Sequence, residues 1–131
     1  MFRARPRRRG RRRAGRGFGA RSRTTELVRQ GLAHVAARGS FTLITGVLAH
    51  EPIRTGAAAS LANGAVEAFV RAAAIEIAPH RVNAVSPTVF TESLDTYGDF
   101  FPGMGSVPLE RVAQAYVRSV EGAQTGRIHQ L

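Results

Sequence analysis

The residues that could support a metal site or acid–base catalysis are few, and their spacing favours neither. The four histidines are scattered and do not have the spacing of metal ligands: His34, His50, His80 and His129. Asp95 and Asp99 lie in a glycine-containing stretch and are more typical of a solvated loop than of an acid–base pair. The chain has no cysteine, which excludes disulfides and cysteine-based zinc sites. We therefore predict no metal site.

Two glycine-rich stretches contain part of a phosphate-binding pattern. "GRRRAGRG" (Gly10–Gly17) has the first two glycines of a P-loop, but Arg16 and Gly17 stand where Lys and Ser or Thr are required. "GRGFGA" (Gly15–Ala20) lacks the last glycine of the dinucleotide pattern. Since no strand pattern precedes either stretch, we attribute both to amino-acid composition.

The positive charge of the chain is concentrated at its start. All 19 basic residues are arginines, and eleven of them lie between Arg3 and Arg23. Residues 24–131 hold eight arginines and nine acidic residues, a formal net charge of −1. Residues 1–23 contain no acid and almost no aliphatic side chain, so we predict a disordered Arg/Gly-rich tail followed by a near-neutral body.

Three interpretations of this tail stay open. An Arg-rich arm could bind nucleic acid through phosphate contacts. Organelle transit peptides are also basic, but they are amphipathic and Ser-rich, and this segment is neither. Alternatively, the tail is non-native coding, because GC-rich DNA yields Arg, Gly, Ala and Pro in almost any frame.

The body has an alternating order of helix and strand patterns. Apolar residues recur at helical spacing in three segments: residues 25–38, 57–78 and 108–121. Three short β-prone segments alternate with them: residues 41–45, 81–85 and 125–131. Residues 95–107 contain three glycines and a proline, and we predict a loop there that could include one helical turn. This order predicts an α/β fold with about three parallel strands and three main helices.

Two of the predicted helices have a distinct apolar face. On the long helix these residues are Val66, Phe69, Val70, Ala73 and Ile77. On the last helix they are Leu109, Val112, Ala113, Tyr116, Val117 and Val120. We expect both faces to pack against the sheet.

Targeting signals are not evident in the sequence. No apolar run approaches the ~20 residues that span a bilayer. No apolar segment follows the basic start directly, as a secretory signal would require. We therefore expect a cytoplasmic location and no membrane partner.

Three stretches of the body resemble the short-chain dehydrogenase/reductase family. They are "GSFTLITG", "GAAASLANGAVEAFVRAAAIEIAPHRVNAVSP" and "TGRIHQL". The segment Ile75–Pro87 is similar to the family's junction between its long active-site helix and the next strand. The resemblance covers roughly residues 27–131 and corresponds to the second half of a member. It implies that residues 24–131 form part of a Rossmann-like domain from an oxidoreductase that uses NAD or NADP.

The resemblance also assigns positions to the family's catalytic residues. In the family a Tyr transfers the proton, a Lys four residues later binds the nicotinamide ribose, and an upstream Ser orients the substrate carbonyl. Aligned on "GAVEAF", Ala59 occupies the Tyr position and Asn63 the Lys position. Thr45 stands at or beside the Ser position and is the catalytic candidate that remains. We expect neither Tyr97 nor Tyr116 to replace the Tyr, because both lie in other elements.

The loop after the second strand departs from the family pattern as well. The family has Pro-Gly followed by a Thr that contacts the cofactor, whereas this chain has "SPTVFTES". Thr88 stands at the Gly position, Glu92 stands at the Thr position, and Thr91 precedes it. A glutamate near a diphosphate would repel it. The cofactor-binding candidates implied by the resemblance are Asn63, Pro87, Thr88 and Thr91.

Together these features predict a truncated and catalytically inactive relative of NAD(P)-dependent oxidoreductases. One alternative is a non-catalytic dimerisation or regulatory module. The resemblance implies pairing of two copies through the helices at residues 25–38 and 57–78. The other alternative is nucleic-acid binding through the basic tail.

Overall fold

The computed structural model describes residues 23–131, so the predictions for residues 1–22 lie outside the described part. The helices are α1 (Arg23–Gly31), α2 (Ala57–Glu76), α3 (Leu94–Tyr97) and α4 (Leu109–Glu121). The strands are β1 (Ser40–Ile44), β2 (Arg81–Ser86) and β3 (Ile128–Gln130). Short 3₁₀ turns occur at Val47–Ala49, Thr91–Ser93 and Gly98–Phe100.

The three strands form one parallel sheet in the order β1–β2–β3. Phe41 of β1 is in register with Val82 of β2, and Ala84 of β2 is in register with Ile128 of β3. Each connection crosses over through a helix, as parallel pairing requires. The predicted α/β class and the three parallel strands are confirmed.

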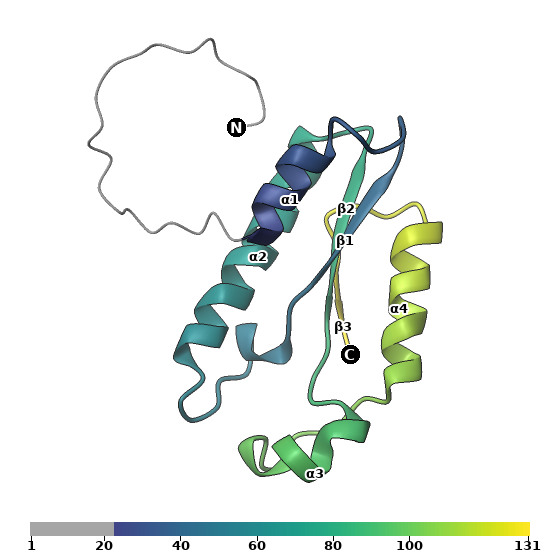
Figure 1. Cartoon of the computed structure of the whole chain (residues 1–131). Helices are drawn as coiled ribbons and strands as arrows, with labels where there is room; N and C mark the ends of the chain where they lie inside the picture. Colours follow the sequence, from purple (N-terminus) through teal and green to yellow (C-terminus); the bar gives the residue numbers. More distant parts are fainter. Residues whose placement is uncertain (1–22) are drawn as a thin grey trace, which may run out of the picture.

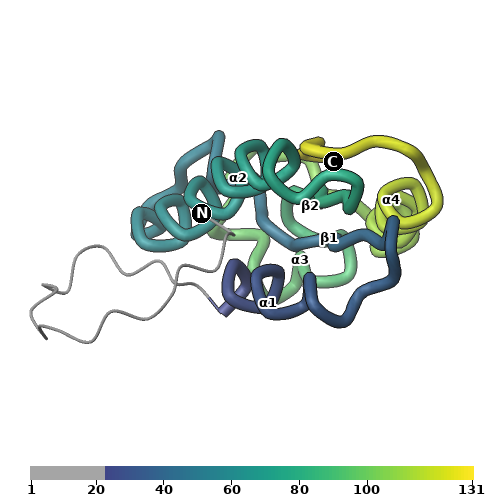
Figure 2. The backbone as a smooth tube through the Cα atoms, turned by 90° about the horizontal axis from the view of Figure 1, so that it is seen from above, coloured from purple at the N-terminus to yellow at the C-terminus, as the bar shows by residue number. Residues whose placement is uncertain are grey.

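Helices cover both faces of the sheet (Figures 1 and 2). α1 and α2 lie on one side of the strands, and α4 lies on the other. Because side chains alternate along a strand, each strand contributes to both layers. The core on the α2 side is formed by Val28, Leu43, Val66, Val70, Ala73, Ala74, Ile77, Val82 and Ala84. The core on the α4 side is smaller and is formed by Val85, Val107, Val112 and Ala115.

The predicted apolar face of the long helix is confirmed. Val66, Val70, Ala73 and Ile77 are buried, and Phe69 packs against the same cluster. The helix ends at Glu76, shortly before Pro79, which cannot continue it. α2 is therefore fixed by its buried stripe, and its N-terminal half extends toward the carboxyl ends of β1 and β2 (Figure 1).

The first helix is shorter than the predicted segment of residues 25–38. α1 ends at Gly31, which packs against the ring of Phe41 so closely that an added Cβ would lie 2.7 Å from Cε1. Glycine is unfavourable inside a helix, and the chain continues in turns, with the Ala33 N–H donating to the Gln30 carbonyl. The spacing of apolar residues predicted a helix as far as residue 38, whereas α1 ends at the glycine.

The predicted apolar stripe of α4 is only partly correct. The buried positions of α4 are Val112, Ala115 and Ser119, and Tyr116 packs beside them. Leu109, Val117 and Val120 are exposed instead. Ser119 is buried in their place and forms hydrogen bonds to two strands: its Oγ lies 2.7 Å from Thr42 Oγ1 and 3.1 Å from Asn83 Nδ2. In residues 23–131, no helix is long and apolar enough to cross a membrane.

Candidate functional site

A cavity of about 350 Å³ lies beyond the carboxyl ends of β1 and β2. This is the region where open parallel sheets bind ligands. Its polar lining comes from Thr45, Asn63, Thr88, Ser93 and Tyr97. The rest of the lining is mostly apolar: Gly46, Val47, Leu48, Pro87, Val89, Phe90 and Phe101. No Lys, Arg, His, Asp or Glu of the described residues lines it, so the cavity suits an uncharged ligand.

One side of this cavity is closed by the segment of residues 90–107, which we call the excursion. Phe90 and Val107 meet in an isolated parallel bridge, and the intervening residues contain α3. The Thr88 hydroxyl donates to the Gly105 carbonyl at 2.9 Å, which links the two ends of the excursion. In this way Tyr97 and Phe101 are brought to a cavity that is otherwise lined mainly by the residues directly after β1 and β2 and by Asn63 of α2.

The hydroxyl of Thr45 lies at the boundary between the cavity and the core. Thr45 follows β1 directly, and only 8% of the residue is exposed. Its Oγ1 donates a hydrogen bond of 2.9 Å to Glu67 Oε1 of α2 and lies 3.5 Å from the Val85 carbonyl. Because the hydroxyl has a single proton, it has none left to donate to a substrate carbonyl in this arrangement.

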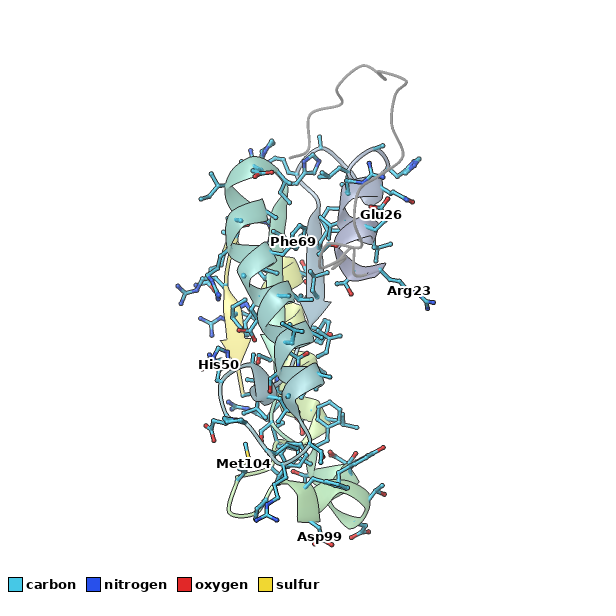
Figure 3. The ribbon with its side chains drawn as sticks, turned by 90° about the vertical axis from the view of Figure 1, so that its left-hand side faces the viewer. Arg23, Glu26, His50, Phe69, Asp99 and Met104 are labelled. Carbon is cyan, nitrogen blue, oxygen red and sulfur yellow. The ribbon has the colours of Figure 1, made fainter. Side chains whose placement is uncertain are left out.

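Glu67 connects Thr45 to His50, which directly follows the 3₁₀ turn at Val47–Ala49. Its carboxylate is 1% exposed, and Oε2 lies 2.7 Å from Nε2 of His50. The same His50 nitrogen lies 3.1 Å from the Gln130 side-chain amide of β3. In Figure 3, His50 lies between α2 and β3. Buried carboxylates require partners of this kind, so the series Thr45–Glu67–His50 is a satisfied polar network.

The residues of α2 at the family's Lys and Tyr positions, Asn63 and Ala59, differ in burial and in their distance from the cavity. Asn63 is half-buried at the cavity, and a Cβ added at Gly46 would be 3.4 Å from its Nδ2. Ala59 is exposed and is not part of the cavity lining. Asn63 could therefore hydrogen-bond a bound hydroxyl, whereas Ala59 has no group to offer.

The cofactor-loop candidates separate into two groups. Pro87 and Thr88 line the cavity; the Pro87 carbonyl accepts a 2.9 Å hydrogen bond from the Val47 N–H. Thr91 does not line it; its hydroxyl lies 3.0 Å from Ser106 Oγ in the excursion. Both carboxylate oxygens of Glu92 lie 3.2 Å from the Leu109 N–H and cap the start of α4. Glu92 therefore acts on α4 rather than on the cavity.

Sequence reasoning missed three residues at or behind this cavity. Tyr97 lines it although it lies on α3, far in sequence from Thr45. Glu67 is four residues after Asn63, and a charged residue in an otherwise apolar helix segment was the available signal. His50 had no signal in its spacing, since its partners lie in α2 and β3.

A family model described as enoyl-(acyl carrier protein) reductase matches residues 21–115. That match covers more than half of the chain and includes α2, β2 and most of α4. The chain belongs to the short-chain dehydrogenase/reductase family. Among curated proteins, none matches it.

Solved structures have the same fold as this short-chain dehydrogenase/reductase chain. The protein lin1944 from Listeria innocua is 47% identical, with a TM-score of 0.81; the match covers 82% of this chain and 55% of lin1944. A small-chain dehydrogenase is 25% identical, with a TM-score of 0.68; the match covers 82% of this chain and 50% of that protein. Another such dehydrogenase, in complex with NADPH, is 23% identical with a TM-score of 0.70. The chain thus spans about half the length of these relatives.

Proposed function

We propose that this chain is a catalytically inactive member of the short-chain dehydrogenase/reductase family that retains the cavity at the carboxyl ends of β1 and β2. One observation carries the proposal: Ala59 occupies the position of the proton-transferring Tyr and lies outside the cavity lining. A methyl group can neither accept nor donate a proton. The family's oxidoreductase chemistry therefore has no proton donor at its usual place.

The remaining polar groups do not replace the missing one. Thr45 donates its proton to Glu67, and Asn63 is neutral where the family has Lys. Tyr97 lines the cavity and is about half exposed, and no Lys, Arg or His among the described residues lines the cavity beside it. This environment supports binding of a small, mostly apolar molecule with one or two hydrogen-bonding groups.

The residues of the cavity do not fit a complete dinucleotide cofactor. Asn63 and Thr88 offer hydrogen bonds to a ribose or an amide, but no positively charged residue among residues 23–131 lines the cavity to face a diphosphate. Glu92, at the position of the family's cofactor-contacting Thr, holds a negative charge at the start of α4. We therefore derive no catalytic step that involves NAD or NADP.

Equilibrium titration with NADH and NADPH tests this part of the proposal. We expect no saturable binding at the cavity below about 1 mM, the upper end of the usual range of KM values for enzymes. The Asn63→Ala variant separates the cavity from other anion-binding surfaces, because it removes the cavity's amide and leaves every arginine in place. Micromolar binding that Asn63→Ala weakens would contradict the proposal.

A second candidate function is pairing with another copy of the chain through α2. Apolar residues follow one exposed or half-exposed stripe of this helix at alternating spacings of four and three: Leu61, Ala65, Ala68, Ala72 and Ile75. Ile75 is 83% exposed, and Leu27 of α1 is exposed as well. Such a stripe is typical of a helix that packs against a second helix. The proposed partner is therefore a second copy of this chain, and a mass measurement under native conditions tests whether such a homo-oligomer forms.

A further inference from the structure

Three arginine side chains meet at a second cavity, between α4 and the segment that leads into β3. The cavity has a volume of about 340 Å³. Arg111 and Arg118 are seven residues apart on α4 and therefore share a helix face, and Arg127 comes from the segment before β3. Gln114, Gln124 and His129 also line it. This cavity shares no lining residue with the one near Thr45 and Asn63.

The arginines of this cavity form no ion pairs within residues 23–131. None of the lining side chains is acidic, and the structure gives Arg111, Arg118 and Arg127 no ion pair with a described residue. Leu131 also lines the cavity, and its main-chain oxygen accepts the Thr88 N–H at 3.0 Å. By contrast, Arg29 pairs with Glu26, and Arg81 donates to the carbonyls of Ser119 and Val120 at 2.8 Å. Like charges that line one concave surface create a positive potential that favours a bound anion.

Buried hydrogen bonds hold the two walls of this cavity in place. Asn83 of β2 is completely buried. Its Oδ1 accepts the Arg127 N–H at 3.0 Å, and its Nδ2 donates to the Gln124 carbonyl at 2.9 Å and to Ser119 Oγ of α4 at 3.1 Å. One buried side chain therefore fixes the segment that carries Arg127 relative to the helix that carries Arg118. Hydrogen bonds to Asn83 therefore anchor the backbone next to Arg118 and at Arg127.

His129 provides a second, independent observation at the same place. Its Nε2 is buried and has no hydrogen-bond partner among the described residues. Burial lowers the pKa of His129 below its ordinary value of 6.5, and the charges of Arg118 and Arg127 lower it further. Glu110 and Glu121 are the acidic residues of α4, and both are exposed and outside the cavity lining. Because Arg118 and Arg127 act on the His129 ring, an anion bound between them would act on it as well, so His129 reports on the charge of this cavity.

We propose that this cavity binds a small molecule that carries phosphate groups. Guanidinium forks match the tetrahedral oxyanion in paired hydrogen bonds, and three of them suit a ligand with more than one negative charge. The glutamine side chains can serve the ligand's uncharged polar groups, and the volume is at the lower end of small-molecule sites. The site is independent of the function proposed for the other cavity, so failure of one leaves the other standing.

Nuclear magnetic resonance of the full-length chain, with inorganic pyrophosphate as the probe, tests this proposal. The imidazole signals of His129 report on the cavity itself, so binding of pyrophosphate to the Arg-rich N-terminal residues does not interfere. We expect saturable shifts of these signals and a rise in the pKa of His129 when pyrophosphate binds, because a nearby anion favours the charged imidazole. The signals of His34 should not follow the same titration.

Two variants and a competing anion make the test decisive. Arg118→Gln combined with Arg127→Gln should weaken pyrophosphate binding about tenfold or more, since two charge-assisted contacts are lost. Arg71→Gln on α2 is the matched control and should leave pyrophosphate binding unchanged. The double variant and the control should both unfold at the wild-type temperature. Absence of saturable His129 shifts, or equal affinity in the double variant, would overturn the proposal. Citrate binding as tight as that of pyrophosphate would overturn the assignment to phosphate.

Discussion

Thr45 Oγ1 donates its proton to Oε1 of Glu67 across 2.9 Å, and Glu67 is almost fully buried. A hydroxyl at the carboxyl end of β1 is in the right place to contact a ligand. While Glu67 is ionised, however, the carboxylate only accepts hydrogen bonds and takes the one proton that Thr45 has. The position expected to orient a substrate therefore has a structural partner, and the arrangement favours stability over carbonyl polarisation.

Glu67→Ala is predicted to destabilise the fold. The substitution removes the partner of both Thr45 and His50 and leaves a cavity in the core beside α2. We expect the free energy of unfolding in urea to fall by about 2–3 kcal/mol. Glu121→Ala, at an exposed position of α4, is the control and should change it by less than about 0.5 kcal/mol. Equal effects of the two substitutions would show that the Thr45–Glu67–His50 network does not stabilise the protein.

Glu92→Ala is predicted to weaken the start of α4. The carboxylate accepts the Leu109 N–H, one of the helix's unpaired donors, and complements the positive end of the helix dipole. We expect a loss of about 1 kcal/mol in unfolding free energy, with faster hydrogen exchange in the first turn of α4. Asp95→Ala, also at an exposed acid of the excursion, should leave exchange in α4 unchanged. An unaffected α4 in Glu92→Ala would contradict the capping role.

The periodic parts of this fold were predictable from the sequence, because they depend on local spacing. The buried stripe of α2, from Val66 to Ile77, and the β-prone run at residues 41–45 are examples. The polar network of Thr42, Asn83 and Ser119 was not predictable, since it joins positions far apart in sequence. That network also explains why the apolar stripe of α4 was only partly correct.

The candidate site was likewise predictable where sequence order determines it, and unpredictable where it depends on contacts between distant positions. Thr45, Asn63, Pro87 and Thr88 line one cavity because parallel strands end at the same edge of the sheet, which sequence order indicates. Thr91 was separated from them by the excursion that brings Tyr97 in. A loop's path is set by contacts such as the bridge between Phe90 and Val107, and no local pattern encodes it.

The stability of the fold is predicted to depend on pH through His129. Its pKa is lowered in the folded state, so the unfolded chain binds more protons at this site when the pH falls below about 6.5. The contribution of His129 to the free energy of unfolding is fully present above that pH, and it is lost as the pH falls through the pKa that His129 has in the folded state. In urea unfolding from about pH 7.5 down to pH 5, His129→Gln should lose stability less steeply than the wild type. Identical slopes for the wild type and His129→Gln would contradict the prediction.

Ile75→Glu is predicted to disrupt self-association. A charge at the most exposed apolar position of the α2 stripe would be desolvated if two copies pair there. Light scattering coupled to gel filtration should give a smaller mass for this variant than for the wild type. Val117→Glu changes a similarly exposed apolar residue on α4 and should keep the wild-type mass. If the wild type is already monomeric, pairing through α2 is excluded.

The most direct test of the proposed loss of catalysis is turnover of nicotinamide cofactors by the purified chain. Oxidation of NADH and NADPH is followed with a panel of aldehydes and ketones, alongside the Thr45→Ala variant. Since Ala59 has no proton to transfer and Thr45 donates its own to Glu67, we predict rates equal to those without protein. Turnover above that level which Thr45→Ala abolishes would show an active site at the end of β1 and contradict the proposal.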